Sequence, residues 1–417
     1  MPAQDPQKPP PTRHVILPFD LRNDANALYD PEKRDAIRSI FPGTIGIGSD
    51  GWFLYLQVHT LPPKPWPLTV AGLPLYLHQI PGQNPMPRAL PVSRKNGSIA
   101  EDQNGRDMQD WEPLFHIIKS HFEELRVPIT EVMYLGNVVF IVLKYRDTNY
   151  NKLPFHAANI SCSYLFEDEM GRPSAPHVRR LSDRAPGDLD MNQYDTLQPG
   201  LRVASSYLLD KPDAFLATTT GVLLKDRVGN EFMTVAAHGF PSECGTRVFH
   251  AFPSTGRDVG ELVMEVSHTD IALVKLRDTE TFSNVMFHDE LIEQPTQLNK
   301  FISAKKYRRS DSVYLRSPNT GFIEGRFSWS SFQAVPGDDY SSKQEWIFTT
   351  WSYLGQDSAI KLHGGMCGST IWDEAGNVLG FFRYAPEEGV MKDWCAATAA
   401  DELINQGYTL VNTSDRA

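Results

Sequence analysis

The stretch Lys361-Leu-His-Gly-Gly-Met-Cys-Gly-Ser-Thr-Ile-Trp372 places one cysteine between two glycines. Within it, Gly365-Met366-Cys367-Gly368 is typical of a tight turn that presents one nucleophile to solvent. Such a turn leaves the backbone N–H groups of Gly365 and Cys367 free to point at one oxygen, which is the arrangement of an oxyanion hole. Because Gly-x-Cys-Gly is short and occurs by chance, its interpretation depends on two segments upstream.

Those two segments supply a candidate base and a candidate carboxylate. Thr234-Val-Ala-Ala-His238 is typical of a strand that ends at a histidine, and Asp270 directly precedes the apolar run Ile271–Leu276. A thiol that attacks an amide carbonyl needs a base, and His238 can take the thiol proton and later give it to the leaving amine. A carboxylate behind the imidazole, here Asp270, fixes the tautomer of the ring and stabilises its protonated form.

Composition and charge narrow the possible classes of protein. The chain has 417 residues, of which 41% are hydrophobic, so two or three domains with real cores are expected. A net charge of −11 disfavours a general nucleic-acid-binding protein. No run approaches the ~18 apolar residues of a membrane helix, so we expect no membrane partner. The four cysteines lack Cys-x-x-Cys spacing, and we expect neither a metal nor another cofactor.

The N-terminal residues and the few cysteines bear on location. Residues 1–13 are rich in proline and lack the apolar core of a signal peptide. Four cysteines in a chain of this length fit a reducing compartment. We therefore expect a cytoplasmic protein, with the nucleus as an alternative location, and not a secreted one. The sequence does not indicate an oligomeric state.

The pattern of apolar residues and turns predicts a mainly β chain in four parts. These are a disordered lead-in (1–25), an α+β accessory domain (26–166), a linker (167–200) and a β-rich domain (201–417). Many short strands separated by regular turns are typical of a sandwich or barrel.

Within the accessory domain, strands are expected over 51–58, 68–77 and 132–145, with an amphipathic helix over 111–125. The β-rich domain is expected to end in a helix over 397–406.

The order and local context of the three motifs resemble the chymotrypsin/trypsin-like peptidase fold. They follow the order of that family: histidine turn, aspartate strand, nucleophile turn. A hairpin over 371–379, turning at Asp373–Gly376, and the strand Gly380–Tyr384 also match it, the latter standing where the family has its substrate-pairing strand. The resemblance covers about residues 200–410. It implies a C-terminal trypsin-like double β-barrel, preceded here by the small α+β domain, and endopeptidase activity on a protein or peptide substrate.

The chain departs from the serine members of this fold at the nucleophile, where Cys367 stands in place of serine. In this respect it is similar to the cysteine proteases of positive-strand RNA viruses that share the fold. Ser369 is the rival nucleophile, but it lies two residues out of register. The resemblance also implies a substrate pocket with Lys361 at its floor, which would suit an acidic side chain, and Phe382 and Tyr384 in its walls.

The leading hypothesis is therefore an intracellular endopeptidase with a catalytic triad of Cys367, His238 and Asp270. The N–H groups of Gly365 and Cys367 would form the oxyanion hole. The alternatives are a pseudoprotease that serves as a binding or scaffold module, and a serine protease that uses Ser369.

Overall fold

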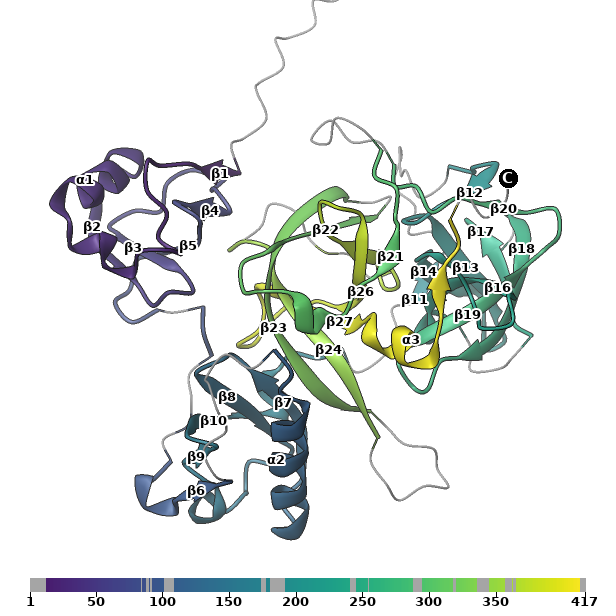
Figure 1. Ribbon diagram of the computed structural model, residues 1–417. Coiled ribbons are helices and arrows are strands. Elements are labelled where there is room, and N and C mark those ends of the chain that lie inside the picture. Colours follow the sequence, from purple (N-terminus) through teal and green to yellow (C-terminus); the bar gives the residue numbers. More distant parts are fainter. Residues whose placement is uncertain are drawn as a thin grey trace, which may run out of the picture. The chain divides into compact units, whose positions relative to one another are not determined.

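The computed structural model describes most of the chain, shown in Figure 1. The described residues are 13–83, 85–87, 90, 92–100, 109–173, 178–180, 192–240, 245–253, 255–287, 295–317, 320–335, 345–356, 362 and 365–412. They form two compact units: Met1–Pro87 with Leu354–Lys361, and Arg88–Tyr353 with Leu362–Ala417. Among the described residues, no helix is long and apolar enough to span a membrane.

The first unit is a small sheet with one helix. Its strands lie in the order β1 (His14–Val15), β4 (Thr69–Val70), β5 (Leu73–His78), β3 (Leu54–Val58) and β2 (Thr44–Ser49). The 3-10 helix η1 (Ala25–Tyr29) and helix α1 (Pro31–Ile40) precede β2. Thus part of the predicted lead-in over 1–25 is ordered, because β1 pairs in parallel with β4. Residues 1–12 lie outside the described part of the chain.

Helix α1 was not expected from the sequence, although its start is well marked. The Asp30 side chain accepts a hydrogen bond from the N–H of Glu32 at 2.9 Å, and Pro31 occupies the first helical position. Both are common at helix N-termini, since a capping oxygen satisfies a free N–H and proline has none to satisfy. The helix buries only Ile37 of its described side chains and is otherwise rich in charged residues, so few apolar residues mark it in the sequence.

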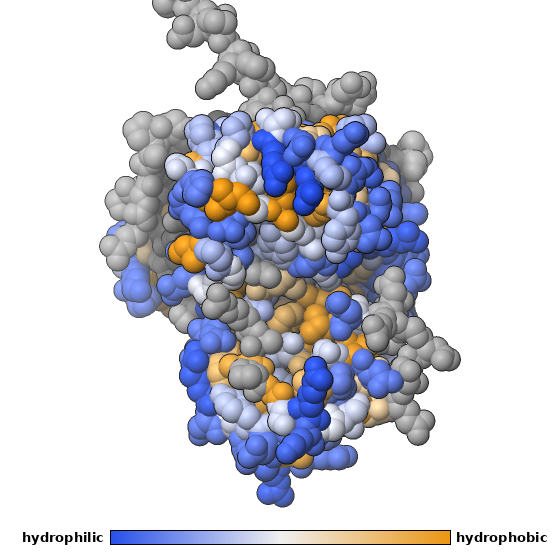
Figure 2. All heavy atoms as spheres, turned by 90° about the vertical axis from the view of Figure 1, so that its left-hand side faces the viewer, coloured by the Kyte–Doolittle hydropathy of each residue, from blue (hydrophilic) through white to orange (hydrophobic). Residues whose placement is uncertain are grey.

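The first unit also exposes several large apolar side chains. Ile16 is 90%, Ile80 62% and Ile45 46% exposed. Figure 2 shows hydrophobic areas set among hydrophilic side chains on the face that it displays.

The second unit contains two β-structures, of which the first is a curled nine-stranded sheet. Its order is β11 (Val178–Arg180), β14 (Lys211–Thr219), β13 (Arg202–Leu208), β17 (Arg247–His250), β18 (Arg257–Glu265), β19 (Ile271–Leu276), β16 (Glu231–Ala236), β15 (Leu223–Lys225) and β28 (Thr409–Leu410). The curl brings the end of β14 back to β16: the N–H of Gly221 donates to the carbonyl of Thr234 at 2.8 Å. A short parallel pair, β12 (Thr196–Leu197) and β20 (Thr281–Phe282), accompanies it.

The second β-structure is a closed six-stranded barrel. Its strands follow the order β22 (Ser312–Ser317), β25 (Thr370–Trp372), β26 (Asn377–Tyr384), β27 (Trp394–Ala399), β24 (Glu345–Tyr353) and β23 (Gly321–Val335), and β23 pairs back with β22. Strand β21 (Lys300–Phe301) joins β26, and helix α3 (Asp401–Gln406) follows β27. A curled sheet followed by a closed barrel confirms the mainly β, trypsin-like fold predicted for the C-terminal part.

Two predicted elements near the C-terminus have different bounds. The helix expected over 397–406 begins only at Asp401, because the residues up to Ala399 form strand β27. The alanines of β27 allow either structure by propensity, and pairing with β24 and β26 makes them a strand. The hairpin predicted over 371–379 is present as β25 and β26, with its turn held by the Asp373 carboxylate.

Residues 88–166 do not form an accessory domain with the residues before them. They contain β6 (Ser98–Ile99), helix α2 (Glu112–Glu124), β7 (Ile129–Tyr134), β8 (Val138–Leu143), β9 (His156–Ala157) and β10 (Ile160–Phe166). Strand β7 pairs with β23, so this segment extends the sheet of the closed six-stranded barrel. Helix α2 packs on β23, where the ring of Phe115 stacks on that of Phe332 with their centroids 4.1 Å apart.

A buried ion pair joins this segment to the barrel. Glu131 on β7 is fully buried and accepts hydrogen bonds from Ser331 at 2.5 Å and from the indole N–H of Trp351 at 2.8 Å. Arg172, inside the predicted linker, donates to the same carboxylate at 2.6 Å. The boundaries predicted at 166 and 200 therefore differ from the observed division after residue 87.

We expect Glu131→Ala to lower the free energy of unfolding of the second unit by about 3–5 kcal/mol, because removing one partner of a buried pair leaves the other charge uncompensated. Urea denaturation followed by tryptophan fluorescence measures this effect. Asp168→Ala is the control, since Asp168 pairs with Arg146 at 2.6 Å at the surface, where such pairs contribute less than about 1 kcal/mol. Equal effects of the two substitutions would contradict the structural role of Glu131.

Candidate active site

Residues 365–368, called the nucleophile turn below, precede β25 and pack against the nine-stranded sheet. Gly365 and Gly368 have φ values of +91° and +88°, a region that favours glycine. A Cβ atom at Gly368 would lie 2.5 Å from the carbonyl oxygen of Thr219 and 2.8 Å from the N atom of Ala236. The two glycines are therefore favoured here by backbone conformation, and Gly368 also by the close approach of β14 and β16.

The carbonyl groups of Gly365 and Cys367 in this turn point toward the nine-stranded sheet. The Gly365 carbonyl accepts hydrogen bonds from the Thr219 hydroxyl at 2.8 Å and from the guanidinium of Arg202. The Cys367 carbonyl accepts from the backbone N–H of Thr219 at 2.9 Å. Within the described part of the chain, the N–H groups of Gly365 and Cys367 have no hydrogen-bond acceptor. That these two N–H groups form the oxyanion hole stays a prediction.

Ser369 has a different position from Cys367. Its side chain is fully buried, and its hydroxyl donates to the Met366 carbonyl at 2.7 Å. The Met366 carbonyl shares a peptide plane with the N–H of Cys367, and the two point in opposite directions. By holding this carbonyl inward, Ser369 directs the Cys367 N–H outward. Cys367 itself is only partly buried.

His238 lies in the 3-10 turn η7 (Ala237–Gly239), directly after β16. Antiparallel pairing of β16 with β19 sets Ala236 opposite Ile271, which brings the residues beyond them, His238 and Asp270, together. Both oxygens of the Asp270 carboxylate lie within 2.8 Å of His238 Nδ1, and the His238 backbone N–H donates to the carboxylate at 3.0 Å. With Nδ1 engaged, Nε2 is the ring atom left for the thiol.

Asp270 is held in an uncommon backbone conformation. Its φ is +64°, and its N–H donates to the Glu265 carboxylate at 2.9 Å. The carbonyl of the preceding residue, Thr269, accepts a hydrogen bond at 2.8 Å from the hydroxyl of Thr398 in the closed barrel. These contacts fix the carboxylate behind the imidazole, and positive φ values outside glycine are often found at functional sites.

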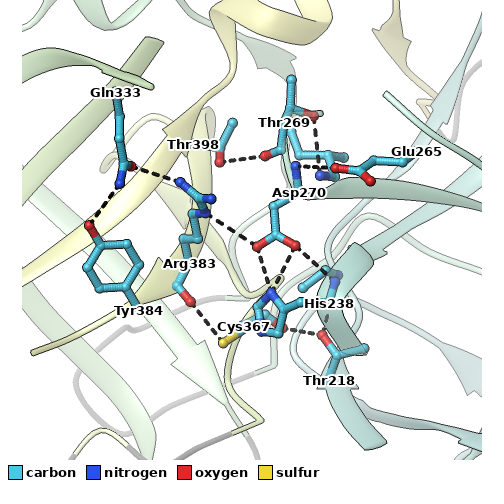
Figure 3. Close-up of polar contacts among 12 residues, drawn as sticks. Thr218, His238, Glu265, Thr269, Asp270, Gln333, Cys367, Arg383, Tyr384 and Thr398 are labelled. Atoms are coloured by element: carbon cyan, nitrogen blue, oxygen red, sulfur yellow. Dashed lines mark hydrogen bonds and ion pairs between the residues drawn. The ribbon is translucent and has the colours of Figure 1, made fainter. Parts of the chain in front are cut away.

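Arg383 is a site residue that the sequence analysis missed. Its Nε lies 3.6 Å from an Asp270 carboxylate oxygen, and its NH1 group donates to Gln333 at 2.8 Å. Figure 3 shows the carboxylate between the imidazole of His238 and the guanidinium of Arg383. The signal in the sequence was a single charged residue in the otherwise apolar end of β26, but spacing gave no reason to place it next to Asp270.

The thiol of Cys367 lies beside Arg383 as well. It donates a hydrogen bond to the backbone carbonyl of Arg383 at 2.9 Å. It is also close enough to His238 to help Asp270 raise the pKa of the imidazole. The cysteines at 162 and 395 are buried, and burial raises the pKa of each thiol to about 12. Cys367 is thus the most accessible thiol among the three that the structure describes.

The side chains of His238 and Asp270 each favour the charged form of the other. Burial opposes protonation of His238, but the hydrogen bond and charge of Asp270, followed by those of Cys367, raise the pKa of His238 to about 10. Burial likewise favours the neutral form of Asp270, yet His238 and then Arg383 hold its pKa below 3.8. An imidazolium facing a carboxylate is therefore stable over a wide pH range.

The residues predicted to line a substrate pocket are placed as follows. Phe382 and Tyr384 lie on β26 and are only 3% and 7% exposed. With so little exposed surface they contribute packing within the barrel, and their role as pocket walls stays a prediction. The backbone of Phe382, however, binds the nucleophile turn, since its carbonyl accepts from Gly368 at 2.8 Å. Lys361 lies outside the described residues.

No protein-family model and no curated protein matches this sequence. Solved structures similar to it include Thermobifida fusca protease A, with 14% identity and a TM-score of 0.35 over 52% of this chain and 99% of that one. Cellulomonas bogoriensis chymotrypsin has 10% identity and a TM-score of 0.36 over 53% and 100%. The active form of the Rv3671c protease from M. tuberculosis has 14% identity and a TM-score of 0.34 over 50% and 79%.

At such low identities and TM-scores, no residue role is carried over from those proteins. The strand order and the closed barrel agree with the trypsin-like double β-barrel that the sequence predicts. Within it, the structure brings together His238, Asp270 and a nucleophile turn that carries Cys367.

We expect the stability lost in Asp270→Asn to depend on pH. Because the pKa of His238 is raised, the stabilisation from its pairing is complete below the ordinary value of 6.5 and is lost as the pH rises toward about 10. Because the pKa of Asp270 is lowered, the stabilisation is also lost as the pH falls below 3.8. Denaturant titrations of wild type and variant should therefore differ most between about pH 4 and 6.5.

His238→Gln provides the control for this titration. In a His238→Gln background, the effect of Asp270→Asn should no longer vary between pH 6.5 and 10, since the titrating imidazole is absent. A difference between wild type and Asp270→Asn that stays constant from pH 5 to 10 would contradict the pairing.

Proposed function

We propose that this protein is an endopeptidase that cleaves peptide bonds with Cys367 as nucleophile, His238 as general base and acid, and Asp270 as the carboxylate that orients His238. The observation that carries the proposal is the contact of the Asp270 carboxylate with His238 Nδ1 at 2.7 and 2.8 Å, next to a thiol that interacts with the same ring. A base, its orienting group and a nucleophile in this sequence of contacts are what acyl transfer requires.

The first half of the reaction forms an acyl-enzyme. In its neutral form His238 takes the proton of Cys367, and the sulfur attacks the carbonyl carbon of the substrate, forming a C–S bond. The negative charge that develops on the carbonyl oxygen is stabilised by the N–H groups of Gly365 and Cys367. When the C–N bond breaks, the protonated His238 gives its proton to the leaving amine. The products are a thioester on Cys367 and a new amino terminus.

The second half releases the acid. His238 accepts a proton from water, the hydroxyl attacks the thioester carbon, and the C–S bond breaks. The sulfur leaves as a thiolate, which the imidazolium of His238 stabilises. The carboxylate of Asp270 keeps that imidazolium charged, in line with the raised pKa of His238.

Two further contacts support Cys367 over Ser369 as the nucleophile. The Ser369 hydroxyl is buried and committed to the Met366 carbonyl. The Cys367 thiol lies beside the Arg383 carbonyl at the surface of the junction. A hydroxyl with no exposed surface cannot reach a substrate carbonyl without breaking the turn that it stabilises.

A library of unstructured peptides, analysed by mass spectrometry for new termini, tests the proposal. We expect Cys367→Ala and His238→Ala to lower kcat by more than about 10⁴-fold, as loss of a triad member does. Cys162→Ala, a change at a buried thiol outside the site, should leave the rate unchanged. Cleavage that persists in Cys367→Ala would exclude the cysteine mechanism, and a folded wild-type protein that cleaves nothing would favour a binding or scaffold module.

A further inference from the structure

A second cation lies beside the carboxylate of the candidate triad. One oxygen of Asp270 lies 2.7 Å from His238 Nδ1 and 3.6 Å from the Nε atom of Arg383 on β26. The side chain of Arg383 is 20% exposed and that of Asp270 is 11% exposed, so water screens the two charges only in part. The steps of the proposed reaction assign this guanidinium no role.

A neighbouring strand of the closed barrel holds Arg383 in this position. Its Nη1 atom donates at 2.8 Å to the side chain of Gln333 on β23, which is 5% exposed. The amide of Gln333 in turn donates to the hydroxyl of Tyr384 at 3.4 Å, as Figure 3 shows. Because Gln333 carries no charge, it fixes the guanidinium without neutralising it. Within the described part of the chain, Asp270 is the anion that pairs with Arg383.

The other groups around Asp270 bring in more negative than positive charge. Glu265 on β18 accepts a hydrogen bond from the Asp270 N–H at 2.9 Å and so adds a second carboxylate. Strand β27 contributes the uncharged hydroxyl of Thr398. His268, in the same loop as Asp270, lies 3.8 Å from the Glu345 carboxylate. Arg383 is therefore the permanent cation that pairs with Asp270 among the described residues.

The proposed reaction requires the pair of His238 and Cys367 to lose one proton. With the ring charged and the thiol intact, the pair has no base and no nucleophile; with one proton fewer, it can react. Burial lowers the pKa of His238, but Asp270 and then Cys367 raise it to about 10, so the ring holds its proton firmly. Loss of this proton makes the site more negative, which a nearby cation favours and a nearby carboxylate opposes.

We propose that Arg383 is a positioning residue whose fixed charge offsets part of the charge of Asp270, and thereby lets the pair of His238 and Cys367 lose its proton at a lower pH. This inference rests on the proposed function. The hydrogen bond from the Cys367 thiol goes to the backbone carbonyl of Arg383, which a side-chain substitution retains. Loss of the charge should move the pH dependence of the reaction, whereas loss of packing alone would lower its rate at every pH.

Alkylation of Cys367 by iodoacetamide reports the loss of this proton, because the thiolate is the reactive form. We would measure its rate by peptide mapping between pH 5 and 10 in wild type, Arg383→Met and Arg383→Lys. The first substitution removes the charge and keeps an apolar chain, and the second keeps a charge. The pH dependence of kcat/KM on a cleaved peptide gives a second measurement of the same ionisation.

For Arg383→Met we expect the pH midpoint of alkylation, and the rising limb of kcat/KM, to move upward by about one pH unit. Below the midpoint the variant is then about tenfold slower than wild type, and at high pH it approaches the wild-type rate. Arg383→Lys should restore most of the shift. Arg257→Met is the matched control: Arg257 is 29% exposed and pairs with Glu280 at 3.0 Å, outside the site, so its loss should leave the midpoint unchanged.

The two proposals fail in different ways. A wild-type Cys367 that iodoacetamide labels no faster than an ordinary exposed thiol would overturn the proposed function, and this inference with it. A reactive Cys367 would overturn the role of Arg383 alone if its midpoint is the same in Arg383→Met as in wild type, or moves as far in Arg383→Lys.

A second uncharged variant covers the case in which Arg383→Met does not fold. Arg383→Gln also lacks the charge but keeps a polar group beside Gln333, and the same upward shift is expected of it. If circular dichroism shows that neither uncharged variant folds, the arginine stabilises the barrel itself, and its proposed role at the site is overturned.

Discussion

The site depends above all on the packing of the nucleophile turn against the end of β14. Thr219 contacts the turn with both its backbone and its hydroxyl, and Gly368 fits only because it has no side chain. This one contact fixes where Cys367 lies relative to His238, which follows the neighbouring strand β16. Cys367 and His238 belong to different β-structures, so they can act together only if such a contact holds the two structures in a fixed position. Small displacements of the reacting groups lower the rate of catalysis strongly.

Charge is distributed around the site in an unusual way for so acidic a chain. Two arginines with little exposure contact the turn: Arg202 donates to the Gly365 carbonyl, and the backbone carbonyl of Arg383 accepts from the Cys367 thiol. Arg383 shares the Asp270 carboxylate with His238, so the carboxylate is satisfied by two cations. This arrangement secures the ionised state of Asp270, and it also means that the imidazolium is not its sole counter-charge. The pKa of His238 is raised because the effects of Asp270, and then of Cys367, outweigh that of burial.

Much of the fold and the contact between His238 and Asp270 could be predicted from the sequence, because both leave local signals. The strand that ends at His238 and the glycines around Cys367 are adjacent in sequence to the residues that they position. Arg202 and Arg383 could not be predicted, because each acts on a residue far away in the chain and carries no motif. The division after residue 87 was missed for the same reason: β7 is an ordinary apolar strand, and only its pairing with β23 assigns it to the barrel.

Inactivation by a peptidyl chloromethyl ketone, followed by peptide mapping, tests the central claim most directly. The reagent places a carbonyl in the oxyanion hole and an alkylating carbon next to the nucleophile, so it reports on turn, base and thiol together. The account predicts one adduct, on Cys367, that forms rapidly in wild type and at least about a hundredfold more slowly in His238→Ala. An adduct on Ser369, equal labelling of Cys162 and Cys395, or a rate that ignores His238 would contradict it.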